Sequence, residues 1–389
     1  MLLPGSPQVR LPLAALLAAA CTAGLLLSPA QAADAPADHD RALRRQLQAL
    51  TDAPGGPPGV IAVLERGHRT DVYRAGVADT AAARPIETTD HMRIASTAKA
   101  YSGAVSLQLV DRRKLRLDDT IGKVLPRLPR AWHRVTLRHL LNHTSGLPDY
   151  SADPEFLSLL TADPRRHFDS RRLLDFVATE PLSFRPGTRY SYSNSDNIAV
   201  ALMAEAVTGR RYEDLLAQLV YRPLRLRSTS LPQGYRMPEP YMHGYEVPPD
   251  PPEDVSEALS ASSVWASGGI ISTPKDMTAF VRGYAGGRLI SDGTRRQQLK
   301  WVNGASEPAG PGENKAGLAI FRYTTRCGVV YGHTGNFPGY TQLVAATADG
   351  KRSLTFSLTT QVNKTNKPDL LKRLRAVEEN FVCALLGKR

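Results

Sequence analysis

The chain has 389 residues, of which 42% are hydrophobic and 22% charged, and its formal net charge is +12. This size and composition are typical of a globular protein with a large core and about two domains. The basic residues occur as scattered pairs such as Arg112-Arg113, without a block of interleaved aromatics, which argues against a nucleic-acid-binding protein. An exported basic protein would be attracted to anionic cell-wall polymers.

Residues 1–32 are predicted to be a secretory signal peptide. Arg10 supplies its positive region, residues 11–27 form the apolar region, and Ala30-Gln31-Ala32 is a small-residue cleavage site. The mature chain would then begin at Ala33. We therefore expect a protein that is secreted and associated with the cell wall.

Two other interpretations of this leader are weaker. Pro12 and Gly24 interrupt the apolar run, which is also short for a membrane span, so no stable membrane anchor is expected. Lipidation at Cys21 is the second alternative. The alanines before this cysteine match the lipidation motif poorly, and the apolar run continues beyond it.

The hydrophobic pattern changes along the chain from strands to helices and back to strands. Strands are predicted at 60–64 and 71–73, joined by a turn at 66–68. Helical spacing follows at 96–114, 135–142, 171–178, 198–208 and 212–220, then a Pro-rich loop at 238–252 and a helix from Pro274. The last third predicts strands at 318–323, 329–331, 340–346 and 353–358, with a hairpin turn at Asp349-Gly350, and a final helix at 369–384.

Strands at both ends of the mature chain, with helices between them, predict an α/β fold. The economical arrangement is one sheet built from both chain ends, with flanking helices and an inserted all-helical domain. The predicted boundaries are 33–100 and 268–389 for the two parts of the α/β domain and 101–267 for the insertion.

Cleavage of the leader leaves two cysteines, Cys327 and Cys383. Export makes a disulfide between them the expected state, and two buried free thiols are the alternative. Two such distant cysteines support neither a zinc site nor a thiol nucleophile.

Ser96-Thr97-Ala98-Lys99 opens a segment with helical periodicity. Residues three apart lie on one helix face, so the Ser96 hydroxyl and the Lys99 amine can meet. A desolvated, neutral lysine could accept the serine proton and make Ser96 a nucleophile. The competing interpretation is an ordinary N-cap serine.

A second match to this spacing is Ser272-Thr273-Pro274-Lys275. Here Thr273 is expected to be an N-cap, with Pro274 at the first helical position and Asp276 completing a capping box. We therefore interpret the second match as structural.

The segment from Pro186 to Asn194 has a Pro-Gly turn just before a predicted helix. In this loop Tyr192 could relay protons, and the Asn194 amide could bind a substrate peptide bond. Ser195-Asp196-Asn197 follows directly and is an alternative candidate for the second functional motif of the chain, after Ser96-x-x-Lys99. It is more simply the first turn of the next helix, capped by Ser195 or Asp196, so Tyr192 is favoured.

The third motif, His333-Thr334-Gly335-Asn336, follows an apolar strand. A histidine in place of the more usual lysine keeps a cationic edge beside a hydroxyl that can bind a carboxylate. Gly335 would allow a substrate backbone to approach. A packed imidazole is the alternative for His333.

The three motifs occur in an order that resembles the serine β-lactamase-related superfamily. The chain is most similar to its branch of secreted Streptomyces-type D-Ala-D-Ala carboxypeptidases, peptidase family S12, and to class C β-lactamases. Residues 138–147 and 266–273 extend the resemblance over nearly the whole mature chain. The resemblance implies a β-lactamase/transpeptidase-like fold with an antiparallel sheet and an active site between its halves.

The resemblance also implies roles. Ser96 would attack, Lys99 would accept its proton, and Tyr192 would pass one to the leaving group. The substrate-binding residues would be Asn194, Trp265, His333, Thr334, Gly335 and Asn336, with an oxyanion hole from the Ser96 and Asn336 N–H groups. No cofactor or metal is expected, because His139 and His143 lack a third ligand. No Gly-x-Ser-x-Gly motif supports an α/β-hydrolase.

Two departures limit the substrate prediction. Asn336 stands where D-Ala-D-Ala peptidases of this type often carry a second hydroxyl, and alternation alone does not decide whether Arg322 reaches the carboxylate site. We expect a monomeric exported serine hydrolase, foremost a D-Ala-D-Ala carboxypeptidase acting on peptidoglycan stem peptides that also binds β-lactams. The alternatives are a class C-like β-lactamase, an esterase or D-aminopeptidase of the same fold, and a non-catalytic wall-binding protein.

Overall fold

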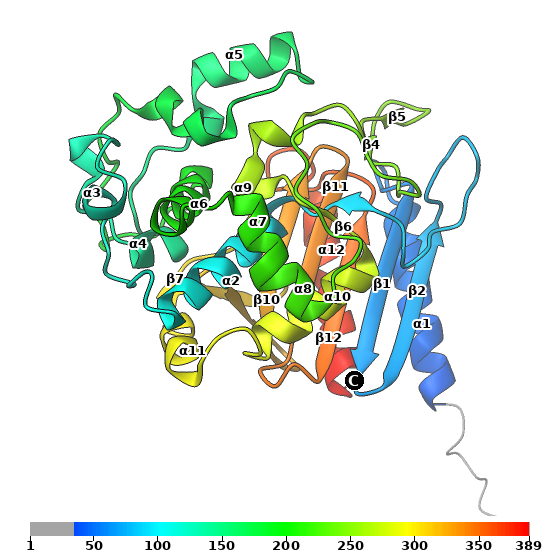
Figure 1. Ribbon diagram of the computed structural model, residues 1–389. Helices are drawn as coiled ribbons and strands as arrows, with labels where there is room; N and C mark the ends of the chain where they lie inside the picture. The colour runs from blue at the N-terminus through cyan, green and yellow to red at the C-terminus, as the bar shows by residue number, and fades with distance from the viewer. Residues whose placement is uncertain (1–34, 389) are drawn as a thin grey trace, which may run out of the picture. The chain divides into compact units, whose positions relative to one another are not determined.

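The structure is a computed structural model and describes residues 35–388, so the predicted signal peptide and Cys21 lie outside the described residues. Its central feature is an eight-stranded sheet with the order β2-β1-β12-β11-β10-β9-β8-β7, in which every neighbouring pair is antiparallel (Figure 1). The strands are β1 (Gly59–Arg66), β2 (Arg69–Gly76), β7 (Val302–Asn303), β8 (Glu313–Ala316), β9 (Phe321–Thr325), β10 (Gly328–Phe337), β11 (Tyr340–Ala346) and β12 (Arg352–Leu358). Short ladders outside this sheet pair β3 (Met92–Arg93) with β6 (Ile271–Ser272) and β4 (Tyr245–Glu246) with β5 (Glu253–Asp254).

Two layers of helices cover the sheet. The α-helices are α1 (Ala35–Thr51), α2 (Ala98–Asp111), α3 (Ile121–Val124), α4 (Leu137–Leu141), α5 (Pro154–Ala162), α6 (Asn194–Thr208), α7 (Tyr212–Leu216), α8 (Arg222–Leu224), α9 (Trp265–Gly268), α10 (Pro274–Ala285), α11 (Asp292–Gln298) and α12 (Pro368–Leu386). The short 3₁₀ and π segments are η1 (Ala95–Thr97), η2 (Arg130–Trp132), η3 (Tyr150–Ala152), η4 (Ser170–Val177), η5 (Ala217–Tyr221) and η6 (Ala261–Ser263). Helix α12 and the Leu43–Leu50 part of α1 pack on one face, and α2 and α10 pack on the other (Figure 1).

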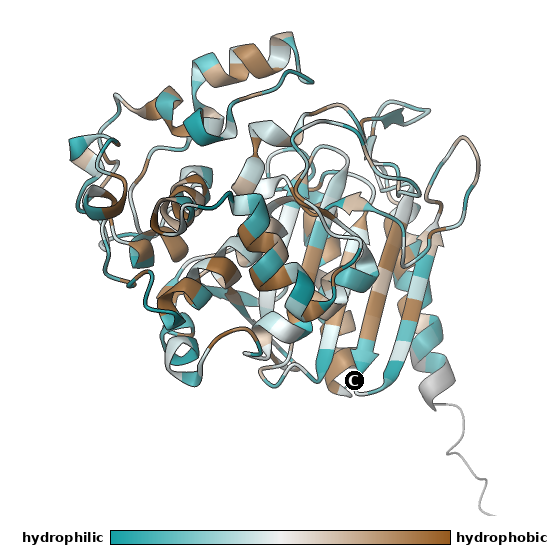
Figure 2. Cartoon of the chain, in the orientation of Figure 1, coloured by the Kyte–Doolittle hydropathy of each residue, from teal (hydrophilic) through white to brown (hydrophobic). Residues whose placement is uncertain are grey.

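Strand β1 shows why the sheet needs cover on both faces. Its side chains alternate, so Val60, Ala62 and Leu64 face the α1/α12 layer, whereas Ile61 and Val63 face the α2 layer. All five are buried, which explains a continuous apolar run where a half-exposed strand would alternate with polar residues. Figure 2 shows this contrast between the mostly hydrophobic β1 and the more hydrophilic edge strand β2.

The predicted α/β fold with a sheet from both chain ends is confirmed. Residues 340–346 form β11 as predicted, and β1, β2, β12 and α12 extend the predicted segments by a few residues. The segment 171–178 is mostly 3₁₀ instead of α-helical, and β9 begins only at Phe321, after Ala319 adopts a positive φ of 54°. The described residues from Asp40 onward form one compact unit, and the domain boundaries stay predictions.

A disulfide joins Cys327, in the turn between β9 and β10, to Cys383 in α12, with Cα atoms 5.1 Å apart. It confirms the predicted pairing and ties the last helix to the middle of the sheet. Within the described residues, no helix combines the length and apolarity needed to span a membrane.

Candidate active site

Ser96 lies in η1, directly before α2, and its side chain lines a cleft of about 910 Å³. The residue before it, Ala95, has a φ of +50°, a conformation that costs free energy for a residue with a side chain. The N-cap of α2 is Thr97, which makes no side-chain capping bond. Ser96 is therefore not a helix cap, and its hydroxyl accepts a hydrogen bond from Lys99 instead.

Lys99 is almost completely buried and lies in the first turn of α2. Its Nζ donates to Ser96 Oγ at 3.1 Å, to Asn194 Oδ1 at 2.7 Å and to the Ser267 carbonyl at 2.9 Å. Burial lowers the pKa of Lys99 to about 7, although nearby carboxylates such as Asp149 act in the opposite direction. Near neutral pH, a large share of the molecules thus carries an amine that can accept the serine proton.

Tyr192 lies on the approach to α6 and covers the lysine. Its ring centroid is 4.9 Å from Lys99 Nζ and 4.4 Å from the ring of His143. The hydroxyl is buried and makes no hydrogen bond with the described residues. Burial raises the pKa of Tyr192 well above its usual value, an effect that Ser96 reduces, so the phenol keeps its proton at neutral pH.

Asn194 is the first residue of α6 and reaches Lys99 from the other side. Its Nδ2 donates to Ser151 Oγ at 2.9 Å and to Asp149 Oδ2 at 3.2 Å, and its backbone N–H donates to the same carboxylate. The carboxamide therefore holds the lysine, whereas the sequence predicted that it would hold substrate. No sequence motif pointed to Asp149, because a lone aspartate after a Gly-Leu-Pro turn carries no catalytic signature.

The predicted cationic edge at His333 is wrong. The imidazole is fully buried, its Nδ1 is 2.6 Å from the Thr334 carbonyl oxygen, and burial lowers the pKa of His333 to about 3. The Thr334 hydroxyl is also buried and donates to the Pro308 carbonyl at 2.6 Å. Neither side chain lines the cleft, and Arg322 does not line it either, because its guanidinium donates to Thr324 on the same strand.

Gly335 brings β10 against residues 94–97, the segment that carries Ser96, where the sequence predicted an approach of substrate. A Cβ at this position would lie 2.4 Å from the Ile94 carbonyl oxygen. Beyond Gly332, β10 pairs with β11 but no longer with β9. The edge of β10 that faces away from β11 is therefore not paired with β9 at residues 333–337. Asn336 lines the cleft at this edge, where backbone groups can bind an extended substrate.

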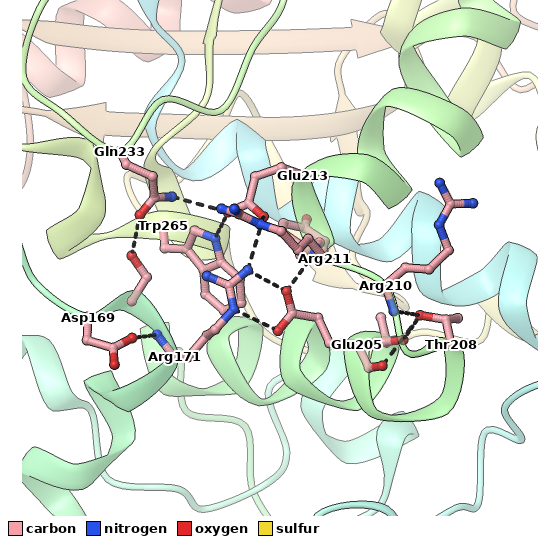
Figure 3. Close-up of polar contacts among 12 residues, drawn as sticks. Asp169, Arg171, Glu205, Thr208, Arg210, Arg211, Glu213, Gln233 and Trp265 are labelled. Atoms are coloured by element: carbon pink, nitrogen blue, oxygen red, sulfur yellow. Dashed lines mark hydrogen bonds and ion pairs between the residues drawn. The ribbon is translucent and has the colours of Figure 1, made fainter.

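Trp265 does not line the cleft, which corrects its predicted role in substrate binding. The side chain is fully buried, its indole N–H donates to Glu213 at 3.0 Å, and the Arg171 guanidinium lies 5.0 Å from its ring (Figure 3). Arg171 also pairs with Glu205 and Glu213, and Gln233 donates to Glu213. The network fixes the start of α9, the helix that provides the Ser267 carbonyl to Lys99.

The alternative second motif, Ser195-Asp196-Asn197, is buried below the site. Helix α6 is preceded by Ser193 at the N-cap, without a side-chain capping bond, so the predicted cap at Ser195 or Asp196 is wrong. Asp196 instead accepts from Ser145 and contacts His143 Nδ1 at 2.8 Å. Burial favours the uncharged forms of this pair, raising the pKa of Asp196 and lowering that of His143 to about 3.

The second serine-x-x-lysine match is structural, as predicted. Thr273 caps α10 by accepting from the Asp276 N–H, and Ser272 contacts Thr229 in a buried site. The Asp276 carboxylate does not complete a capping box but accepts from Ser228 and Thr229. His139 caps α4 together with Thr136, so it has a structural partner of its own.

The cleft also has charged residues that no sequence motif indicated. The cleft is lined by two acidic residues, Asp149 and Glu307, and by two basic residues, Lys364 and Arg375. Arg375 donates to the Gly310 and Gly312 carbonyls. These residues come from loops and from α12. They line the same cleft as Ser96 only because the assembled sheet brings these segments together.

A buried lysine hydrogen-bonded to a serine at a helix start, beside an open strand edge, is the arrangement of a serine hydrolase. The sequence pattern of the Beta-lactamase family matches residues 27–380, and the chain belongs to this family. The predicted superfamily is thus confirmed.

Three relatives illustrate the range within the family. "Penicillin-binding protein 4*" of Bacillus subtilis (strain 168) is 25% identical over 80% of this chain and 71% of its own length. A "D-aminopeptidase" of Cereibacter sphaeroides (strain KD131 / KCTC 12085) is 32% identical over 53% of this chain, and the aligned part spans only 39% of that protein. The solved D-stereospecific amidohydrolase from Streptomyces sp. has a TM-score of 0.73 and 28% identity, covering 83% of this chain and 94% of the other.

Proposed function

We propose that this protein hydrolyses an amide or ester of a D-amino acid through an acyl-enzyme on Ser96. The observation that carries the proposal is the buried Lys99 amine, 3.1 Å from Ser96 Oγ and with a pKa of about 7. A lysine in this state serves as a general base at neutral pH, which a solvated lysine does not.

In the proposed mechanism, Lys99 accepts the Ser96 proton while Oγ attacks the substrate carbonyl carbon. The N–H groups of Ser96 and Asn336 stabilise the oxyanion, the second by resemblance to the family, and loss of one such donor typically costs about a hundred- to a thousandfold in rate. Tyr192 keeps its proton in the free enzyme and is therefore suited to pass it to the leaving amine, while the proton that Lys99 took from Ser96 restores the phenol. Water then hydrolyses the acyl-enzyme.

The charge distribution favours a substrate whose carboxyl end is blocked, as in a D-amino-acid amide. A D-Ala-D-Ala carboxypeptidase must bind a free carboxylate beside the third motif. Here His333 is neutral, Thr334 is bonded to Pro308, and Arg322 does not line the cleft. The Streptomyces amidohydrolase and the Cereibacter D-aminopeptidase support this choice by their similarity.

Carboxypeptidase action on peptidoglycan stem peptides is the second candidate. Lys364 and Arg375 line the cleft and offer cations to a carboxylate from a different direction. The similarity to the Bacillus penicillin-binding protein supports the same candidate and suggests that β-lactams acylate Ser96. We further propose export through the leader at residues 1–32.

Labelled penicillin capture followed by mass spectrometry tests the nucleophile. The adduct is expected on Ser96 and should disappear in Ser96→Ala, whereas Ser272→Ala is the matched control and should be labelled normally. An adduct on another residue would contradict the assignment.

Three substrates then separate the candidate activities. We expect ammonia release from D-phenylalanine amide with little D-alanine release from a diacylated Lys-D-Ala-D-Ala peptide, and a loss of at least about a thousandfold in Ser96→Ala. Faster turnover of the peptide would establish the carboxypeptidase, and rapid nitrocefin turnover would establish a β-lactamase.

A further inference from the structure

One wall of the cleft is apolar and is built largely by α5. Phe156, Leu157 and Leu160 of this helix line the cleft together with Leu259 and Val264 from the chain before α9. Leu157 is 43% exposed, the most exposed large hydrophobic side chain of residues 35–388. We call these five residues the apolar wall.

The apolar wall is held in place from behind. The Phe156 ring is 5.1 Å from Tyr150, 5.2 Å from Phe168 and 5.4 Å from Phe176, and Asp153 caps α5 by accepting from the Phe156 N–H. This aromatic cluster fixes the helix, so the exposure of Leu157 is a feature of a packed element and not of a frayed end.

The wall is also connected to the catalytic residues. Tyr150 donates from its hydroxyl to the Ser263 carbonyl, and the neighbouring Asp149 accepts from Asn194. Ser96 lines the same cleft as Leu157 and Leu160. A group bound against the wall therefore lies in the cavity in which the acyl transfer takes place.

The size and chemistry of this cavity point to a bulky substrate. A single exposed leucine needs no explanation, but several apolar side chains that line the same cleft as Ser96 are typical of a ligand site. The cleft of about 910 Å³ is far larger than a D-alanyl group requires. A small substrate would leave the wall in contact with water.

We propose that the apolar wall binds a bulky apolar side chain of the substrate, aromatic or branched aliphatic. This inference rests on the proposed function and specifies its substrate class. A hydrophobic pocket typically discriminates by about ten- to two-hundredfold per methylene group, so a phenylalanyl substrate should be preferred over an alanyl one by at least about tenfold.

Kinetics with Leu157→Ser tests the proposal, and because this residue is exposed its replacement should leave the fold intact. We expect kcat/KM for D-phenylalanine amide to fall about tenfold and that for D-alanine amide to stay unchanged. In D-alanine p-nitroanilide the aromatic ring lies on the leaving side of the scissile bond. A fall of kcat/KM for this compound in Leu157→Ser would therefore place the apolar wall on the leaving side, and an unchanged value would place it on the acyl side. Leu289→Ser, a partly buried leucine that does not line the cleft, is the matched control.

Boronic acids supply a readout that does not depend on amide turnover. By isothermal titration, 2-phenylethylboronic acid should bind the wild type at least about tenfold more tightly than methylboronic acid, and Leu157→Ser should remove most of this difference. Equal affinities in the wild type, absence of binding by both compounds, or an unchanged ratio in Leu157→Ser would overturn the inference. Failure of amide hydrolysis alone would instead overturn the proposed function.

Discussion

The Lys99 amine lies 2.7 Å from the Asn194 carboxamide oxygen, closer than its 3.1 Å separation from Ser96 Oγ. Since Asp149 and Ser151 hold Asn194 in turn, the position of the base depends on α6 as well as on its own helix. The amide thereby orients the lysine amine together with the Ser267 carbonyl.

The pH profile should report the state of this lysine. Lys99 must be neutral to accept a proton, so kcat/KM is expected to rise with pH, with a midpoint near its pKa of about 7. In Asn194→Asp a carboxylate beside the amine favours the charged form, and the midpoint should move to higher pH by about one unit or more. Asn363→Asp is the control for the pH midpoint. It also adds a carboxylate to the cleft lining, but Asn363 contacts Asn336, whereas Asn194 contacts Lys99. An unmoved midpoint in Asn194→Asp would contradict the base assignment.

Gly335→Ala should damage the site through the backbone. Its Cβ would lie 2.4 Å from the Ile94 carbonyl oxygen and push β10 away from residues 94–97. We expect a loss of about 1–3 kcal/mol in stability, from overpacking, and a lower kcat. Gly234→Ala, where a Cβ meets nothing within 4 Å, should leave both unchanged. Thermal unfolding and amide kinetics measure the two effects, and normal behaviour of Gly335→Ala would refute this contact.

Trp265→Phe tests the network behind the cleft. The substitution removes the indole N–H that donates to Glu213, which should cost about 1–2 kcal/mol in the free energy of unfolding. It should also lower kcat and shift the pH midpoint, because the Ser267 carbonyl two residues later accepts from Lys99. Arg172→Ala breaks an exposed ion pair with Asp175 and should change stability by less than about 1 kcal/mol. Equal effects of both substitutions would argue against a positioning role.

Replacing Cys327 and Cys383 by serine should destabilise the protein without altering the site. The disulfide spans 56 positions, and the chain-entropy estimate for such a loop is about 4 kcal/mol, an upper figure. Neither cysteine lines the cleft, so kcat/KM at 25 °C should be retained. Urea unfolding of the oxidised and substituted proteins measures the difference, and a large loss of activity in the folded variant would be unexpected.

The fold and the contact between Ser96 and Lys99 could be predicted because both depend on local spacing. Period-two and helical patterns located most strands and helices, and the three-residue spacing of Ser96 and Lys99 brings them together within one helical turn. The capping signature at Thr273 likewise identified the second serine-x-x-lysine match as structural. Helix α5 was missed, and with it the apolar wall.

Burial and long-range contacts could not be predicted in this way. The charge of His333 depends on whether solvent reaches it, and Phe321 and the strands around it close off the ring. Asn194 donates a hydrogen bond to Asp149, 45 positions away in the chain, and Trp265 donates one to Glu213, 52 positions away. The sequence by itself determined the fold class, the disulfide partners and the serine–lysine pair, because these follow from periodicity and residue chemistry. Only the tertiary structure decided which motif residues face the cleft, since exposure and pKa depend on neighbours that the folded chain brings together.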